Sequence, residues 1–126
     1  MQNYIANLEH PAQMKIYHNP RCSKSRQTLQ RIADAGVEPE VIEYLKSPPT
    51  AEELDGVLKK LGLEPRELMR TKETVYKELG LAGKQLSRAD AIQVMVEHPV
   101  LIERPIVVEG NKAILGRPPE NVDELL

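Results

Sequence analysis

Cys22 is the only cysteine in this chain of 126 residues, and it is the side chain best suited to covalent chemistry. It lies in the polar, basic segment Pro20-Arg-Cys-Ser-Lys-Ser25, with His18 before it and Arg26 after it. The thiolate is the reactive form, and only about 3% of an ordinary thiol is ionised at neutral pH. Positive charge nearby lowers the pKa of a thiol and raises that fraction. A lone cysteine can also be a small buried hydrophobe. Such residues rarely lie in a basic loop, so the segment predicts a reactive thiol.

A single cysteine also limits what this thiol can do. It excludes an internal disulfide, a Cys-x-x-Cys redox pair and a multi-cysteine metal site. Ser25 stands where a dithiol motif would have its second cysteine, and its hydroxyl could donate to the thiolate but cannot resolve a disulfide. A positive pocket around Cys22 would favour an oxyanion. The Cys-x5-Arg loop of phosphatases is absent, because position 28 is Thr28. Any disulfide step therefore needs an external thiol.

Positive charge is concentrated around this cysteine. Residues 11–33 contain five basic side chains and no acidic one, although the chain as a whole has 17 basic and 19 acidic residues and a net charge of −2. The net charge argues against a duplex-binding protein, and the lack of Phe and Trp nearly excludes base-stacking platforms. No apolar run approaches the roughly 18 residues of a membrane span, and residues 1–13 lack the pattern of a secretory signal. We therefore expect a cytoplasmic monomer that binds neither nucleic acid nor membrane.

The pattern around Cys22 predicts a strand–helix–strand unit. Residues 14–17 alternate as a strand does and end at a turn, and a helix of about three turns runs from Ser23 to a stop at Gly36. Residues 41–45 form the next strand, and crossovers of this length join parallel strands. Cys22 thus lies where a strand leads into a helix, and the unpaired N–H groups of a helix start stabilise a thiolate.

The rest of the chain predicts a helical block and then a hairpin. A capping box at Thr50 begins one helix, Pro65 opens a short segment, residues 75–79 form a turn or two, and Ser87 caps a further helix that ends at His98. Residues 106–109 and 112–115 flank a Gly-Asn hairpin turn, and residues 119–126 form a final helical piece. The fold class is α/β. We expect a thioredoxin/glutaredoxin-like mixed sheet (β-α-β then β-β-α) with a helical insertion between its halves. Residues 14–126 form one domain, and residues 1–13 are a poorly ordered extension.

Several segments in the same order resemble one family, the glutaredoxin-coupled arsenate reductases called the ArsC family. The resemblance covers nearly the whole chain, from Met14 to about Pro118. Its segments are His18-Asn-Pro-Arg-Cys-Ser-Lys-Ser-Arg26, Tyr44-Leu-Lys-Ser-Pro-Pro-Thr50, Leu68-Met-Arg70, His98-Pro-Val-Leu-Ile-Glu-Arg-Pro-Ile-Val-Val108 and Leu115-Gly-Arg-Pro118.

The resemblance implies an activity and a set of site residues. Cys22 would be the nucleophile that forms a thioarsenate adduct, with glutathione as co-substrate and glutaredoxin as partner. The family has no metal site and no bound cofactor. The remaining positions that match the family's site are Arg70, Arg104 and Arg117, which would hold arsenate, His18 and Ser25, which would favour the thiolate, and Pro105, which would be a cis-proline.

Two other functions stay open from the sequence. The first is an Spx-like redox regulator that binds RNA polymerase, although such regulators carry a Cys-x-x-Cys motif that Ser25 interrupts. The second is a glutathione-dependent thiol reductase of another substrate. From residue type alone, His18 could equally be a turn histidine, and Tyr17, Tyr44 and Tyr76 are expected to be core aromatics.

Overall fold

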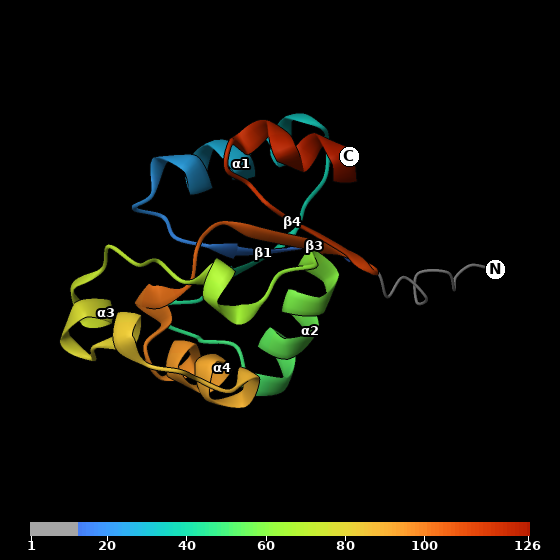
Figure 1. Ribbon diagram of the computed structural model, residues 1–126. Coiled ribbons are helices and arrows are strands. Elements are labelled where there is room, and N and C mark those ends of the chain that lie inside the picture. The colour runs from blue at the N-terminus through green and yellow to red at the C-terminus, as the bar shows by residue number, and fades with distance from the viewer. Residues whose placement is uncertain (1–12) are drawn as a thin grey trace.

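The computed structural model describes residues 13–126 and arranges them around one four-stranded sheet, with helices on both faces (Figure 1). The expected N-terminal extension, apart from Gln13, lies outside the described residues. In chain order the elements are β1 (Lys15–His18), α1 (Ser23–Asp34), β2 (Glu40–Glu43), α2 (Ala51–Leu61), η2 (Pro65–Leu68), α3 (Thr74–Glu78), η3 (Leu81–Gly83), α4 (Arg88–Glu97), η4 (Pro99–Leu101), β3 (Ile106–Glu109), β4 (Lys112–Leu115) and η5 (Pro119–Leu125), where η denotes a 3₁₀ helix.

The sheet has the strand order β2-β1-β3-β4. Strand β1 pairs in parallel with β2 and antiparallel with β3, and β3 pairs antiparallel with β4. Helix α1 supplies the crossover that the parallel pair requires. The hairpin turns at Gly110, whose φ of 59° lies in the left-handed region that glycine adopts at little cost. The predicted thioredoxin-like fold class, with a helical block between the two halves of the sheet, is confirmed.

Alternation along the strands gives the sheet two hydrophobic faces. Ile16 and Val107 point to one face and pack with Ile32 of α1 and Val122 of η5. Tyr17 of β1 and Ile106 and Val108 of β3 point to the opposite face, where the larger core lies. Successive side chains of a strand point to opposite faces, so two short strands serve both cores.

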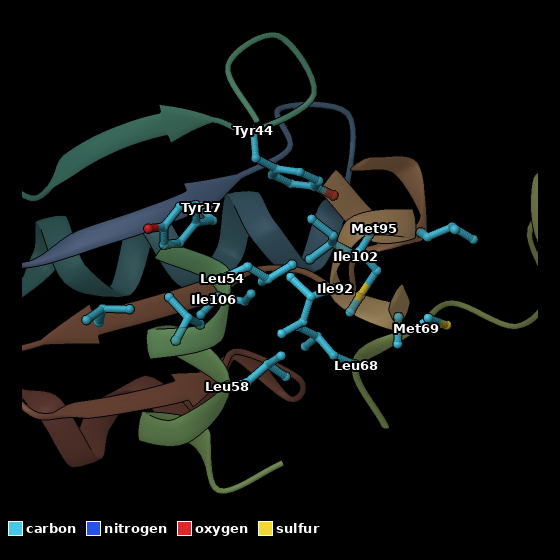
Figure 2. Packing of buried hydrophobic residues seen from close by; sticks show 14 of the residues in the cluster. Tyr17, Tyr44, Leu54, Leu58, Leu68, Met69, Ile92, Met95, Ile102 and Ile106 are labelled. Atoms are coloured by element: carbon cyan, nitrogen blue, oxygen red, sulfur yellow. The ribbon is translucent and has the colours of Figure 1, made fainter. Parts of the chain in front are cut away.

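The helical block covers the face with the larger core (Figures 1 and 2). The predicted capping box of α2 is present, because Thr50 Oγ1 accepts from the Glu53 N–H and Glu53 Oε1 accepts from the Thr50 N–H. Leu54 and Leu58 of α2 pack against Met95 of α4 and its neighbours. No helix in the part of the chain that the structure describes is long and apolar enough to cross a membrane.

Strand β2 differs from its predicted range, residues 41–45. It begins at Glu40 and ends at Glu43, because the Glu43 carbonyl accepts hydrogen bonds from the N–H groups of Lys46 and Ser47 and the chain turns there. Tyr44 consequently lies in the turn after the strand rather than within it, and its side chain is 1% exposed.

Gly116 packs closely against Thr28 of α1 and against Pro105 before β3. Its N–H donates to the carbonyl of Pro105 at 2.9 Å, and its carbonyl accepts from the Thr28 hydroxyl at 3.3 Å. A Cβ atom at this position would clash with Thr28 Oγ1 and would lie 2.8 Å from Pro105 Cγ. Thr28 is fully buried and hydrogen-bonded, so it has little room to move away. The segment after β4 can therefore lie against α1 only with glycine here.

We expect Gly116→Ala to lower the free energy of unfolding by about 1–3 kcal/mol, the usual cost of forcing extra volume into a packed site. Urea denaturation measures this change. Gly56→Ala is the matched control, because Gly56 lies inside α2 with nothing within 4 Å of an added Cβ. That variant should gain about 0.5–1 kcal/mol, since alanine favours the helix. An equally stable Gly116→Ala protein would contradict the packing described here.

Candidate active site

Cys22 caps the N-terminus of α1 in a tight turn after β1. Its N–H donates to the Asn19 carbonyl at 3.0 Å, and its own carbonyl accepts from the Arg26 N–H at 3.0 Å. The Asn19 side chain accepts from the Arg21 N–H at 3.0 Å and fixes the turn. Cys22 is 8% exposed, so little of the residue reaches solvent. The predicted position at a strand-to-helix junction is confirmed.

His18 and Ser25 form a buried pair behind the turn. Ser25 Oγ lies 2.6 Å from His18 Nδ1 and accepts from the Asn19 N–H at 3.0 Å. Burial lowers the pKa of His18, Glu43 opposes this effect and Arg26 adds to it. The neutral imidazole is therefore favoured at neutral pH. Both side chains hold the turn that carries Cys22. That they also favour the thiolate, as the resemblance implies, stays a prediction.

The Cys22 thiol is more acidic than usual for reasons that lie partly outside its own segment. Burial raises the pKa of Cys22. Four groups lower it by more than burial raises it: the backbone N–H groups of Ser25 and Lys24 and the guanidinium groups of Arg104 and Arg117. Both amides belong to the first turn of α1, where the backbone N–H groups have no partner within the helix. The net pKa lies below its ordinary value.

Arg104 and Arg117 reach the sulfur because of how the strands pair. Ile106 at the start of β3 lies opposite Tyr17 of β1 and opposite Leu115 at the end of β4. The segment before β3 and the segment after β4 therefore both lie at the carboxyl end of β1, where the turn to Cys22 begins. Arg117 Nη1 lies 3.8 Å from Cys22 Sγ and 3.4 Å from the Arg104 carbonyl.

The peptide bonds between each of these arginines and the proline that follows it are both cis. The resemblance implied a cis bond at Pro105. That at Pro118 was not anticipated.

Arg70 comes to the same place from the helical block. The Arg70 N–H donates to the Leu101 carbonyl at 2.7 Å, the Glu103 N–H donates to the Leu68 carbonyl at 2.8 Å, and Met69 forms an antiparallel bridge with Ile102. These contacts join the segment after η2 to the segment before β3. Where these two segments meet, a cleft of about 350 Å³ is lined by Arg70, Arg104 and Arg117, among other residues. The three arginines that the resemblance singled out thus share one cleft, although spacing alone gave no sign of it.

Two carboxylates that the sequence interpretation did not select also line this cleft. Glu103 Oε1 lies 2.8 Å from Arg104 Nη1 and 3.9 Å from Arg117 Nε, and Glu73 Oε2 lies 2.7 Å from Arg70 Nη2. The one sequence signal that could have identified Glu103 is its position directly before Arg104. In the described part of the chain no group of His, Cys, Asp or Glu side chains is arranged to hold a metal ion.

The sequence predicted only part of the environment of Tyr44. It belongs to the larger core, as expected of a core aromatic, but its hydroxyl is buried and has no hydrogen-bond partner among the described residues. Figure 2 shows the ring extending from the turn after β2 towards the segment that carries Ile102. Burial raises the pKa of Tyr44 to about 12, with Arg104 and Arg70 lowering it. The positive charges of Arg104 and Arg70 in the cleft therefore act on the Tyr44 hydroxyl.

Fold and site define a class of protein: thioredoxin-like, with one nearly buried cysteine and a cleft of arginines beside it. Residues 17–125 match the ArsC family, so the chain belongs to that family. The uncharacterized protein YfgD of Escherichia coli is 57% identical over 115 residues, which are 90% of this chain and 97% of that protein. An arsenate reductase of Haemophilus influenzae is 48% identical over 88% of this chain and 97% of its own length. The structure of an arsenate reductase from Vibrio cholerae has a TM-score of 0.87 at 52% identity, covering 91% of this chain and 98% of that one.

We expect Arg117→Gln to raise the pKa of the Cys22 thiol, because it removes one of the charges that lower it. The pH dependence of alkylation by iodoacetamide gives the midpoint, which should move to higher pH. Arg21→Gln is the matched control, since Arg21 is the neighbour of Cys22 in sequence but is exposed. A shift in the control as large as that in Arg117→Gln would contradict the assignment of the charge to the cleft.

We expect Tyr44→Phe to raise the free energy of unfolding by about 1 kcal/mol, because it removes a buried hydroxyl that lacks a partner. Urea denaturation measures the change. Tyr17→Phe is the control, since Tyr17 lines an open surface cleft and its hydroxyl is not among the buried atoms without partners. A loss of stability in Tyr44→Phe would show that the hydroxyl is bonded in solution.

Proposed function

We propose that this chain reduces arsenate to arsenite through a covalent adduct on Cys22. The observation that carries the proposal is the 3.8 Å contact between Arg117 Nη1 and Cys22 Sγ at a cleft lined by three arginines. A thiolate alone would repel an oxyanion. Guanidinium groups beside it bring the two negative charges together and stabilise the charge that develops as they react.

The arginines suit a tetrahedral oxyanion because of their shape as well as their charge. A guanidinium presents several N–H donors in a rigid plane and can bind two oxygens at once. Arg104 Nε is buried and has no partner among the described residues, so one donor of this guanidinium is unused. Membership of the ArsC family and the names of the relatives agree with arsenate as that oxyanion.

In the first step the Cys22 thiolate attacks arsenic and forms a sulfur–arsenic bond. An oxygen of arsenate leaves as water, with its protons taken from the oxyanion and from solution. Arg117 Nη1 lies 3.8 Å from the sulfur and Arg104 lines the same cleft, so both would hold the remaining oxygens. Arsenic stays in oxidation state +5 in this step, because no electron pair has yet moved to it.

The second step needs a thiol that this chain does not contain. Cys22 is its single cysteine, and the Ser25 hydroxyl cannot resolve a disulfide. Glutathione attacks the Cys22 sulfur, a disulfide bond forms, and the electron pair of the sulfur–arsenic bond passes to arsenic, which leaves as arsenite. A glutaredoxin thiol then takes the glutathione and frees Cys22. We propose glutathione as co-substrate, with no bound cofactor. We place the protein in the cytoplasm, since glutathione keeps thiols reduced in that compartment. We propose a monomer as the working form.

We expect arsenate-dependent oxidation of NADPH when the protein is supplied with glutathione, glutaredoxin and glutathione reductase. Cys22→Ser should reduce the rate to that measured without the protein, because the hydroxyl is a far weaker nucleophile at neutral pH. Phosphate in place of arsenate is the matched substrate control, since it has the same shape and charge.

Glutathione-dependent arsenate turnover retained in Cys22→Ser would contradict the mechanism. Reduction of a small glutathione mixed disulfide without any arsenate turnover would instead identify a thiol reductase of another substrate. Binding of RNA polymerase without arsenate turnover would favour a redox regulator.

A further inference from the structure

Glu103 places a carboxylate between the two arginines that lower the pKa of Cys22. Its Oε1 lies 2.8 Å from Arg104 Nη1 and 3.9 Å from Arg117 Nε, and it also accepts from the Arg104 backbone N–H at 3.3 Å. The side chains of Glu103 and Arg104 are 28% and 15% exposed, so solvent screens their pairing less than it would at an open surface. An oxyanion that enters the cleft meets a negative charge already held there.

The pairing leaves the arginine donors only partly used. Both the ion pairs and the side-chain hydrogen bonds of Glu103 run through one oxygen, Oε1. Arg104 Nε remains buried without a partner among the described residues. A tetrahedral oxyanion presents several oxygens and can satisfy Nε and a terminal nitrogen of one guanidinium together. Exchange of the carboxylate for an oxyanion thus gains a hydrogen bond that Glu103 does not supply.

We propose that Glu103 is an internal anion that occupies Arg104 and Arg117 in the free protein and that substrate displaces, so that this side chain sets the oxyanion affinity of the cleft and the acidity of Cys22. The identity of the oxyanion rests on the proposed function, whereas the pairing itself does not. Glu103 acts here through the two arginines, which makes it a positioning and specificity-determining residue rather than one that touches the reacting atoms.

The groups around the Cys22 thiol determine how Glu103 affects its acidity. Arg104 and Arg117 lower the pKa of Cys22, as do the amides of Ser25 and Lys24 from α1. Behind the turn, the His18 ring is held by Ser25 and favours its neutral form. Tyr44, from the turn after β2, keeps its proton at neutral pH because burial raises its pKa to about 12. The two arginines are the cations that Glu103 pairs with, so a neutral side chain at position 103 leaves more of their charge to act on the sulfur.

Glu103→Gln separates the effect of charge from that of position. The amide keeps a side-chain oxygen where Oε1 accepts from Arg104, but it removes the negative charge. We expect the midpoint of the thiolate absorbance titration to fall by about half a pH unit. We also expect arsenate and inorganic phosphate each to bind about tenfold more tightly, a change of about 1.4 kcal/mol. The rate of Cys22 alkylation at rising anion concentration measures that binding through protection of the thiol.

Glu73→Gln is the matched control. Glu73 is equally exposed at 27%, lines the same cleft and pairs with Arg70 at 2.7 Å, but Arg70 is not among the groups that lower the pKa of Cys22. We expect a smaller shift of the thiol midpoint in this variant. An equal shift in both variants would overturn the proposal, because it would reflect the overall charge of the cleft. An unchanged or raised midpoint in Glu103→Gln, or weaker anion binding, would also overturn it and would leave Glu103 as a support for the arginines.

The thiol titration keeps this proposal separate from the proposed function. A lowered midpoint in Glu103→Gln, with tighter phosphate binding, supports the internal anion even if neither protein turns over arsenate. Arsenate turnover in the coupled assay, with no change of midpoint in Glu103→Gln, supports the proposed function and overturns the role of Glu103. Thermal unfolding of each variant confirms that the compared proteins are folded.

Discussion

A nearly buried sulfur that must carry a negative charge is the constraint on which this site depends. Burial alone favours the neutral thiol, and it is the largest single influence on the pKa of Cys22. The α1 amides compensate in part, because a helix start presents unpaired N–H groups. Arg104 and Arg117 supply the rest, and Arg117 does so at 3.8 Å. An acidic thiol therefore requires both the helix and the distant arginines.

The sheet topology meets this requirement with few residues. Because β3 runs antiparallel to β1 and to β4, the segment before β3 and the segment after β4 meet at the carboxyl end of β1. Arg104 and Arg117 each lie two residues outside the hairpin, and both precede a cis proline. The Gly116 backbone between β4 and Arg117 packs on Thr28 of α1, so the helix that carries Cys22 and the segment that carries Arg117 are in direct contact. The reactive thiol and its cation are thus positioned by one packed junction.

How much of this arrangement can be predicted from sequence depends on how local its causes are. The capping box of α2, the stop of α1 before Gly36 and the hairpin at Gly110 are set by neighbouring residues, and all three were predicted. The charge around Cys22 was assigned to residues nearby in sequence, whereas Arg117, which contacts the sulfur in the structure, is 95 residues away. The Ser25 hydroxyl, which could donate to the thiolate, also bonds the partners that the fold brings near it, His18 and Asn19, and its position in the sequence does not identify them. Only the resemblance to a family pointed to Arg70, Arg104 and Arg117.

The helical block between the two halves of the sheet is part of the site rather than an addition to it. Its contact with the segment before β3 consists of two backbone hydrogen bonds and one bridge, which set Arg70 beside Glu103 and Arg104. That contact brings a third guanidinium to the cleft together with its own carboxylate, Glu73. Each arginine has an acidic neighbour, yet the cleft stays positive before any ligand enters, because four cations (Arg70, Lys72, Arg104 and Arg117) line it against only two carboxylates (Glu73 and Glu103). A site of this kind avoids the cost of unpaired charges at close range, and it selects a ligand whose oxygens satisfy the arginines better than two glutamates do.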